Sequence, residues 1–162
     1  MPTPSSPRNP TVKRPHFSLW ASLEAGLLAG ALFLLLESLS SWLVGAGSPM
    51  GPAKLTLRSI LNLGPGAPTE PYVLTVLVVH FGLSLMTTAA LGYLIHRVVR
   101  YWAVTLGVVY GLLLYGINFF LFAFWLPDIT AATDLFMFTN YMIYGGAAAW
   151  IYQWRAARFA AA

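Results

Sequence analysis

Four strongly polar residues interrupt the most apolar stretches of this sequence: Glu37, His80, Asn118 and Asn140. A carboxyl group beside an imidazole can exchange a proton in the physiological pH range, because the imidazole titrates there. The two amides can add hydrogen bonds to an ion or to a small polar ligand. These residue types therefore favour a proton, ion or polar-solute site, provided that the fold brings them together.

The sequence lacks the residues that most other kinds of chemistry require. Cysteine is absent, which excludes disulfides and thiolate chemistry. One His, one Glu and two Asn form a weak transition-metal set, and His80 and His96 lie about 24 Å apart on one predicted helix, so they cannot ligate one haem. A serine-hydrolase site is not expected either, because Ser84 lies one helical turn from His80 on the same predicted helix and no oxyanion donors are evident. We therefore expect no metal, no cofactor and no enzymatic activity.

The composition indicates a protein that is surrounded by lipid. Of the 162 residues, 58% are hydrophobic and only 9% are charged, whereas a soluble domain carries about 25% charged residues. The net charge of +4 comes from basic residues beside the apolar runs, where they set orientation in a membrane. Nucleic-acid binding is therefore not expected.

Four apolar runs are long enough to cross a bilayer, which requires roughly 20 residues each. A proline-rich tail at residues 1–17 precedes them, and the first external loop contains a short amphipathic helix at residues 53–63, with Lys54 and Arg58 on one side. The sequence thus predicts an all-α, four-helix transmembrane domain at residues 18–158. Its spans are expected at residues 18–44, 72–96, 103–126 and 135–154.

The basic residues predict the orientation of these spans. Seven of them fall on one side and two on the other, a bias that places both termini in the cytoplasm; the seven are Arg8, Lys13, Arg14, Arg97, Arg100, Arg155 and Arg158. Five tryptophans lie at predicted span ends, as in an interfacial aromatic belt: Trp20, Trp42, Trp102, Trp125 and Trp154. Glu24, near the cytoplasmic end of the first span, is expected to pair with Arg97, Arg100 or Arg155.

The four polar residues are predicted to share one depth, roughly 10 Å inside the outer ends of their spans. Polar groups are costly against lipid, so they should face the bundle interior; Ser41, Ser84 and Tyr115 can join them. Two interpretations stay open. The residues form a hydrogen-bonded cluster that holds the helices in register, or they form a site for a proton, an ion or a small polar ligand.

Small residues at spacings of four predict close packing between the helices. They occur at Gly26 and Gly30, at Gly107 and Gly111, and in the run that begins at Gly145. Such spacings are common in membrane helices and carry no information about a ligand.

Three short motifs carry a resemblance to a known family: GSPMGP after the first span, VVHFGLS in the second and YGLLLYGINFF in the third. With them, the chain resembles the small four-helix bacterial inner-membrane proteins allied to the YagU family, which are often labelled sodium:proline symporters. The resemblance implies a bacterial plasma-membrane protein. A symporter of that kind needs ten or more helices, which four spans cannot supply. Relatives often carry a His where this chain has Asn140, a departure that weakens a carried-over metal or proton site.

Two functions follow as competing hypotheses. In the first, the chain acts alone or as a homo-oligomer, and its polar layer handles a proton, an ion or a small polar solute. In the second, it is a non-catalytic accessory subunit of a larger membrane complex, and the aromatic faces of its third and fourth spans contact a partner.

Overall fold

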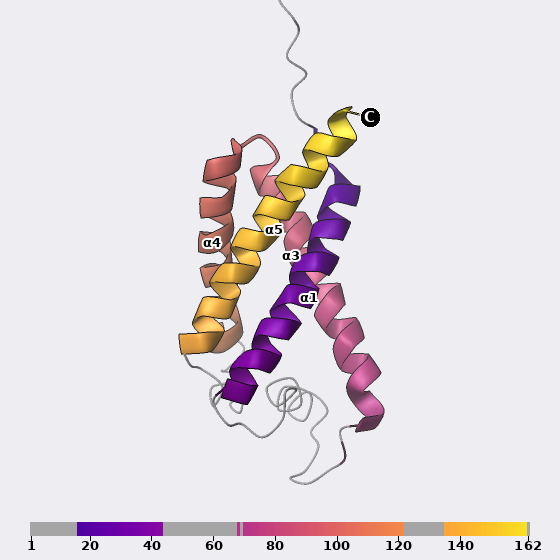
Figure 1. Cartoon of the computed structure of the whole chain (residues 1–162), viewed down its shortest axis with the longest axis vertical. Coiled ribbons are helices and arrows are strands. Elements are labelled where there is room, and N and C mark those ends of the chain that lie inside the picture. The colour runs from indigo at the N-terminus through magenta and orange to yellow at the C-terminus, as the bar shows by residue number, and fades with distance from the viewer. Residues whose placement is uncertain (1–15, 44–67, 69, 122–134, 162) are drawn as a thin grey trace, which may run out of the picture.

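The computed structural model describes residues 16–43, 68, 70–121 and 135–161, and every regular element among them is a helix (Figure 1). The four α-helices are α1 (Leu19–Leu43), α3 (Val73–Ile95), α4 (Arg100–Gly116) and α5 (Leu135–Ala161). A 3₁₀ turn, η1 (Glu70–Tyr72), precedes α3, and a π-helical turn, η2 (Ile117–Leu121), continues α4. The predicted all-helical class is confirmed for these residues.

Three helical segments are long and apolar enough to cross a bilayer. They are Leu19–Leu43, Val73–Ile95 and Arg100–Phe120, with mean hydropathies of 1.9, 1.9 and 1.8. The prediction of membrane-type helices is therefore confirmed for three segments, by length and composition. At 27 residues α5 is also long enough, but polar residues such as Asn140 and Gln153 lower its hydropathy, and it is not among the three.

Two helix ends differ from the expected ranges. α4 begins at Arg100, three residues before the expected start at 103, directly after a short turn in which Val99 is extended. α5 continues to Ala161, seven residues past the expected end at 154, because the alanines and arginines that follow Trp154 are strong helix formers. The predicted amphipathic helix at residues 53–63 and residues 1–15 of the predicted tail lie outside the described residues.

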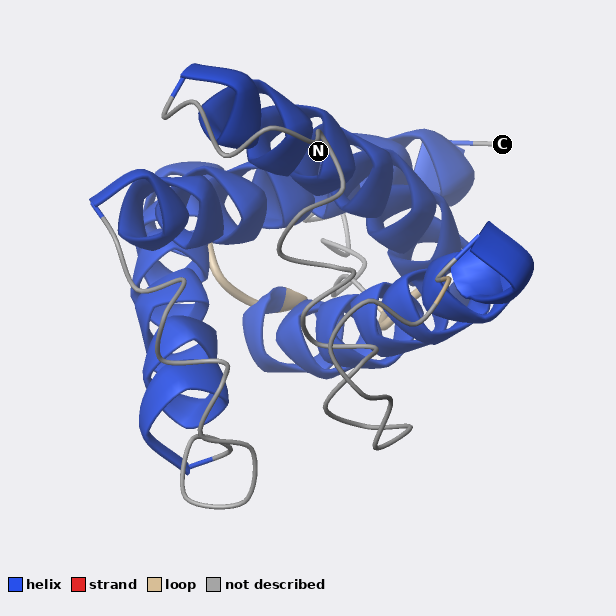
Figure 2. Cartoon of the chain, turned by 90° about the horizontal axis from the view of Figure 1, so that it is seen from below, coloured by secondary structure: helices blue, strands red, loops and turns tan. Residues whose placement is uncertain are grey.

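The helices are arranged around a common axis rather than in one flat layer (Figure 2). α5 packs against both α4 and α1, and α1 also packs against α3. α3 and α4 make few contacts beyond the turn that joins them, and their ribbons diverge from that turn toward the other end of the bundle (Figure 1). This divergence matters for the site described below.

Glycines allow the closest approach between α4 and α5. A Cβ atom on Gly107 would collide with the carbonyl group of Gly145, and one on Gly111 would collide with the carbonyl group of Tyr141. α1 meets α3 in a similar way, since a Cβ on Gly30 would lie 2.7 Å from Ser84 Oγ. The short helix separations depend on these residues having no side chain.

At the end of the bundle where the turn joins α3 to α4, the helices are held together by buried alanines, aromatic residues and one ion pair. Tyr152, Leu91 and Ile95 are almost fully buried between α1, α3 and α5. The Arg155 guanidinium donates to the Glu24 carboxylate, joining α5 to α1. Arg155 is one of the three arginines expected to pair with Glu24, so that expectation is confirmed.

Candidate functional site

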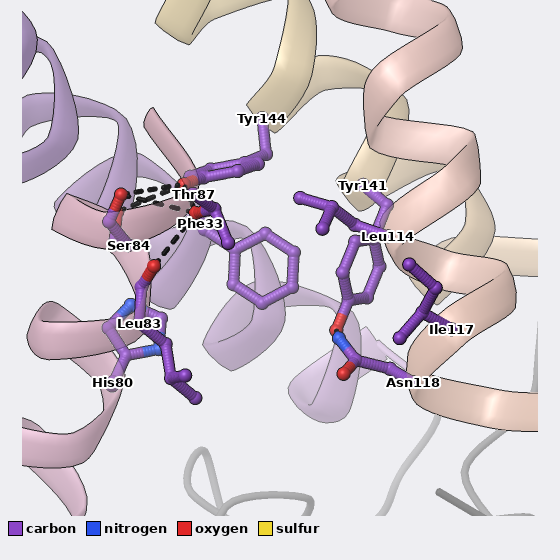
Figure 3. Close-up of a pocket in the computed structure, with 10 residues that line it drawn as sticks. All are labelled: Phe33, His80, Leu83, Ser84, Thr87, Leu114, Ile117, Asn118, Tyr141 and Tyr144. Atoms are coloured by element: carbon purple, nitrogen blue, oxygen red, sulfur yellow. Dashed lines mark hydrogen bonds between the residues drawn. The ribbon is translucent and has the colours of Figure 1, made fainter. Parts of the chain in front are cut away.

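A cavity of about 230 Å³ lies where α3 and α4 diverge. All four helices contribute to its wall, and η2 adds two residues. Rings and aliphatic chains make up most of the lining, which consists of Phe33, His80, Leu83, Ser84, Thr87, Leu114, Ile117, Asn118, Tyr141 and Tyr144 (Figure 3). The cavity is therefore mainly apolar with a few polar groups, the usual character of a small-molecule site.

One wall of the cavity reaches the outer surface of the bundle. Leu83 lines the cavity and is nevertheless 57% exposed. One residue earlier on α3, a Cβ on Gly82 would meet no atom within 4 Å. Because α3 and α4 make few contacts with each other, the cavity reaches the surface of the bundle between them.

Hydroxyl groups form a closed network along the α3 side of the cavity. Ser84 Oγ donates to the Gly26 carbonyl at 2.7 Å, and Thr87 Oγ1 donates to the Leu83 carbonyl at 2.8 Å. The Tyr144 hydroxyl lies 2.8 Å from Thr87 Oγ1 and 3.0 Å from Thr88 Oγ1, so it can donate to the first and accept from the second. Every hydroxyl hydrogen in this network has an acceptor, as buried polar groups require.

His80 keeps one nitrogen available. Its Nε2 lies 3.0 Å from the Gly30 carbonyl oxygen. A carbonyl only accepts, so Nε2 carries the hydrogen, and in the neutral ring Nδ1 is then an acceptor. No described residue makes a hydrogen bond to Nδ1. His80 therefore offers an acceptor at the edge of the cavity.

Asn118 and Tyr141 form the polar group on the opposite side. Asn118 Nδ2 donates to the Tyr141 hydroxyl oxygen at 2.5 Å. The wide turn of η2 carries Asn118, and such π-helical turns are frequent at functional sites. Within the described part of the chain, Asn118 Oδ1 and the Tyr141 hydroxyl hydrogen have no other hydrogen-bond partner, so this pair offers one acceptor and one donor.

Phe33 separates the two polar sides. Its ring centroid lies 4.9 Å from that of Tyr141 and 5.9 Å from that of His80, and Figure 3 shows the ring between the α3 hydroxyls and the Asn118–Tyr141 pair. The polar residues at this level therefore do not form one continuous hydrogen-bonded chain. A solute in the cavity would contact Phe33 with polar groups on both sides.

The structure brings three of the seven predicted polar residues to the cavity, His80, Ser84 and Asn118, and leaves four outside its lining. Asn140 donates to Ser40 Oγ at 3.0 Å across the α1–α5 contact. Tyr115 packs edge-on against Phe138 and Tyr141. Ser41 is buried on α1.

Glu37 is the fourth residue outside the cavity lining. It lies one helical turn beyond Phe33 on α1, is only 9% exposed, and has no hydrogen-bond or ion-pair partner among the described residues. Among the described residues no group of three possible metal ligands occurs.

Sequence reasoning did not select Phe33, Thr87, Tyr141 or Tyr144. A signal for the hydroxyl network was present, because Ser84, Thr87 and Thr88 follow the i, i+3, i+4 spacing of one helix face. Tyr141 and Tyr144 share that spacing on α5. Phe33 gave no signal, since it is one apolar residue among many in its span.

Comparison with known proteins identifies no relative: no protein-family model matches the chain, and neither a curated protein nor a solved structure matches it significantly.

Proposed function

We propose that this chain is a four-span membrane protein that binds a small, mainly apolar molecule with a hydroxyl or N–H group, admitted sideways from the bilayer. One observation carries the proposal: a cavity whose lining has hydrogen-bonding groups that no described residue uses opens beside an exposed leucine on a face of apolar side chains. The proposal retains the solute-handling hypothesis and changes the expected solute from polar to amphipathic.

The length and position of α5 support the proposal that the chain has a fourth membrane-spanning helix. Its 27 residues extend about 40 Å, enough to cross the hydrocarbon core of about 30 Å. α5 packs along α1 and α4, which are both apolar enough to span, so a bilayer around these two helices also surrounds α5. With four spans both termini share one side, which the basic residues indicate is the cytoplasm. The family resemblance makes the bacterial inner membrane the proposed location.

The cavity volume limits the size of the ligand. Drug-sized ligands occupy pockets of about 300 to 1,000 Å³, whereas an engineered apolar cavity of about 150 Å³ holds benzene. A cavity of about 230 Å³ suits a substituted single ring, or the end of a longer lipid chain.

The polar groups limit its chemistry. His80 Nδ1 and Asn118 Oδ1 accept hydrogen bonds, and the Tyr141 hydroxyl donates one. A ligand with one O–H or N–H group can satisfy an acceptor that no described residue bonds. This favours alcohols and phenols over pure hydrocarbons.

Proton handling is a second candidate, and Glu37 is the observation that favours it. A buried carboxyl group within a spanning helix is costly and is often functional. It ranks second because Phe33 interrupts the polar groups and no described residue joins Glu37 to His80 by a hydrogen bond. The accessory-subunit hypothesis is tested when the chain is purified in mild detergent, because a stoichiometric second protein would support it.

The test of the cavity uses a photoactivatable alkylphenol that carries a diazirine, with the full chain in lipid nanodiscs. We expect labelled peptides around Leu83 and Leu114, and competition by 4-propylphenol but much less by 4-propyltoluene, which lacks the hydroxyl. Leu114→Trp fills the cavity and should abolish the labelling. Leu113→Trp is the matched control, because Leu113 is 58% exposed and lies outside the lining. Equal labelling of both variants would contradict the proposal.

A further inference from the structure

A second cluster lies far from the cavity, where α4 begins and α5 ends. Trp150 and Trp154 are one turn apart on α5, with ring centroids 6.1 Å apart and an interplanar angle of 6°. The Arg158 guanidinium lies 3.9 Å from the centroid of Trp154, and the Arg100 guanidinium of α4 lies 5.3 Å from that of Trp150. We call these four residues the arginine–tryptophan strip.

The strip carries positive charge that the described residues do not neutralise. Arg155, on the same helix, is paired with Glu24. Neither Arg100 nor Arg158 has a carboxylate partner among the described side chains. Glu37 is the other carboxylate among the described side chains. It lies about 20 Å from Glu24 along α1, toward the opposite end of the bundle. Among the described residues, these two guanidinium groups therefore have no carboxylate partner and are available to an anion.

The strip also presents apolar surface at the edge of the apolar bundle. Trp150 is 47% exposed. Arg100 is the first residue of α4, so it marks the level where this helix leaves the apolar layer, and α5 continues beyond that level to Ala161. From Trp150 to Arg158 the strip extends about 12 Å along α5. Indole rings at such a boundary favour the region between acyl chains and headgroups.

We propose that the arginine–tryptophan strip binds the headgroup of an anionic phospholipid. A guanidinium group matches phosphate oxygens with two parallel hydrogen bonds. The exposed part of Trp150 supplies apolar surface for the glycerol and upper acyl region of the same molecule. Free phosphate would use only the arginines, so the combination with exposed tryptophan favours a lipid.

The alternative role of these contacts is structural, since cation–π pairs also fix arginine side chains at a helix end. A purely structural role predicts that the wild type has no preference for an anionic lipid. Arg97 provides the control for a third explanation, general attraction of anionic lipid to positive charge at this end of the bundle. Arg97 lies in the turn before α4, is exposed, and contacts no aromatic ring or carboxylate in the described part of the chain. Arg97→Gln therefore removes the same charge from the same end and leaves the strip intact.

The experiment measures which lipids the purified full chain retains. The protein is taken from membranes containing equal amounts of phosphatidylglycerol and phosphatidylcholine, and native mass spectrometry counts both lipids on it. The wild type should retain phosphatidylglycerol preferentially. Arg100→Gln and Arg158→Gln should each reduce this preference at least about tenfold, the loss expected when one hydrogen bond to a charged group is removed. Arg97→Gln should change it much less.

Two further variants keep the test independent of folding. Trp150→Leu retains both charges and should still weaken phosphatidylglycerol retention, while far-UV circular dichroism verifies that each variant is helical. Equal retention of the two lipids by the wild type would overturn the proposal. So would an effect of Arg97→Gln as large as that of Arg100→Gln, because general attraction to the positive end of the bundle would then explain the preference.

Discussion

Replacing Gly111 with alanine should force α4 away from α5. A Cβ atom at this position collides with the Tyr141 carbonyl oxygen and lies 2.9 Å from the carbonyl carbon. Carbon atoms in good contact are about 3.5 to 4.0 Å apart, so the helices must separate by roughly 1 Å. A gap of that size forfeits a quarter to a half of each affected van der Waals contact.

The expected loss follows from two opposing terms. Overpacking of a close contact costs about 1 to 3 kcal/mol, and the upper part of this range applies because the colliding atoms belong to backbone that cannot rotate away. Alanine recovers about 1 kcal/mol through its better helix propensity. We therefore expect Gly111→Ala to lower the free energy of unfolding by about 1 to 2 kcal/mol.

The measurement is reversible unfolding in mixed detergent micelles, followed by far-UV circular dichroism. Gly82→Ala is the matched control, because a Cβ there meets no atom within 4 Å. It should raise the free energy of unfolding by up to about 1 kcal/mol through helix propensity alone. If Gly111→Ala were as stable as Gly82→Ala, the close α4–α5 contact would be refuted.

Three further predictions use other buried groups. Tyr144→Phe removes the hydroxyl at the centre of the α3 network and should cost about 0.6 to 2 kcal/mol of unfolding free energy, whereas Tyr93→Phe, 65% exposed, should be neutral in the same assay. Glu37→Gln removes a carboxyl group without a described partner, so the free energy of unfolding should stay the same or rise; a clear loss would reveal a partner outside the described residues. Tyr141→Phe should weaken alkylphenol binding in competition labelling, by up to about tenfold for one hydrogen bond, and leave the affinity for a propylarene without a hydroxyl unchanged.

The all-helical class and the membrane-type helices could be predicted because they depend on composition along the chain. Few charges and long apolar runs are visible without a structure, and α1 and α3 begin and end within one residue of the expected ranges. An arginine partner for Glu24 could also be predicted, because basic residues gather at that end of the bundle; the structure selects Arg155 from the three that the sequence offered.

The site was only partly accessible, because depth in a membrane does not fix the rotation of a helix. Glu37 and His80 were expected at one level, yet His80 bonds to the Gly30 backbone and lines the cavity, whereas Glu37 lies outside the lining. The placement of Asn118 depends on the π-helical turn η2, which no sequence pattern indicated. The role of Phe33 as a divider depends on packing between four helices, and its spacing along the chain does not encode it.

Saturable binding of tritiated 4-propylphenol to the full chain in nanodiscs tests the central claim most directly. The account predicts one site per chain, displaced by unlabelled 4-propylphenol, lost in Leu114→Trp and retained in Leu113→Trp. Uptake that grows linearly with concentration, equal in the wild type and in both variants, would show that the molecule merely dissolves in the lipid and would contradict the account.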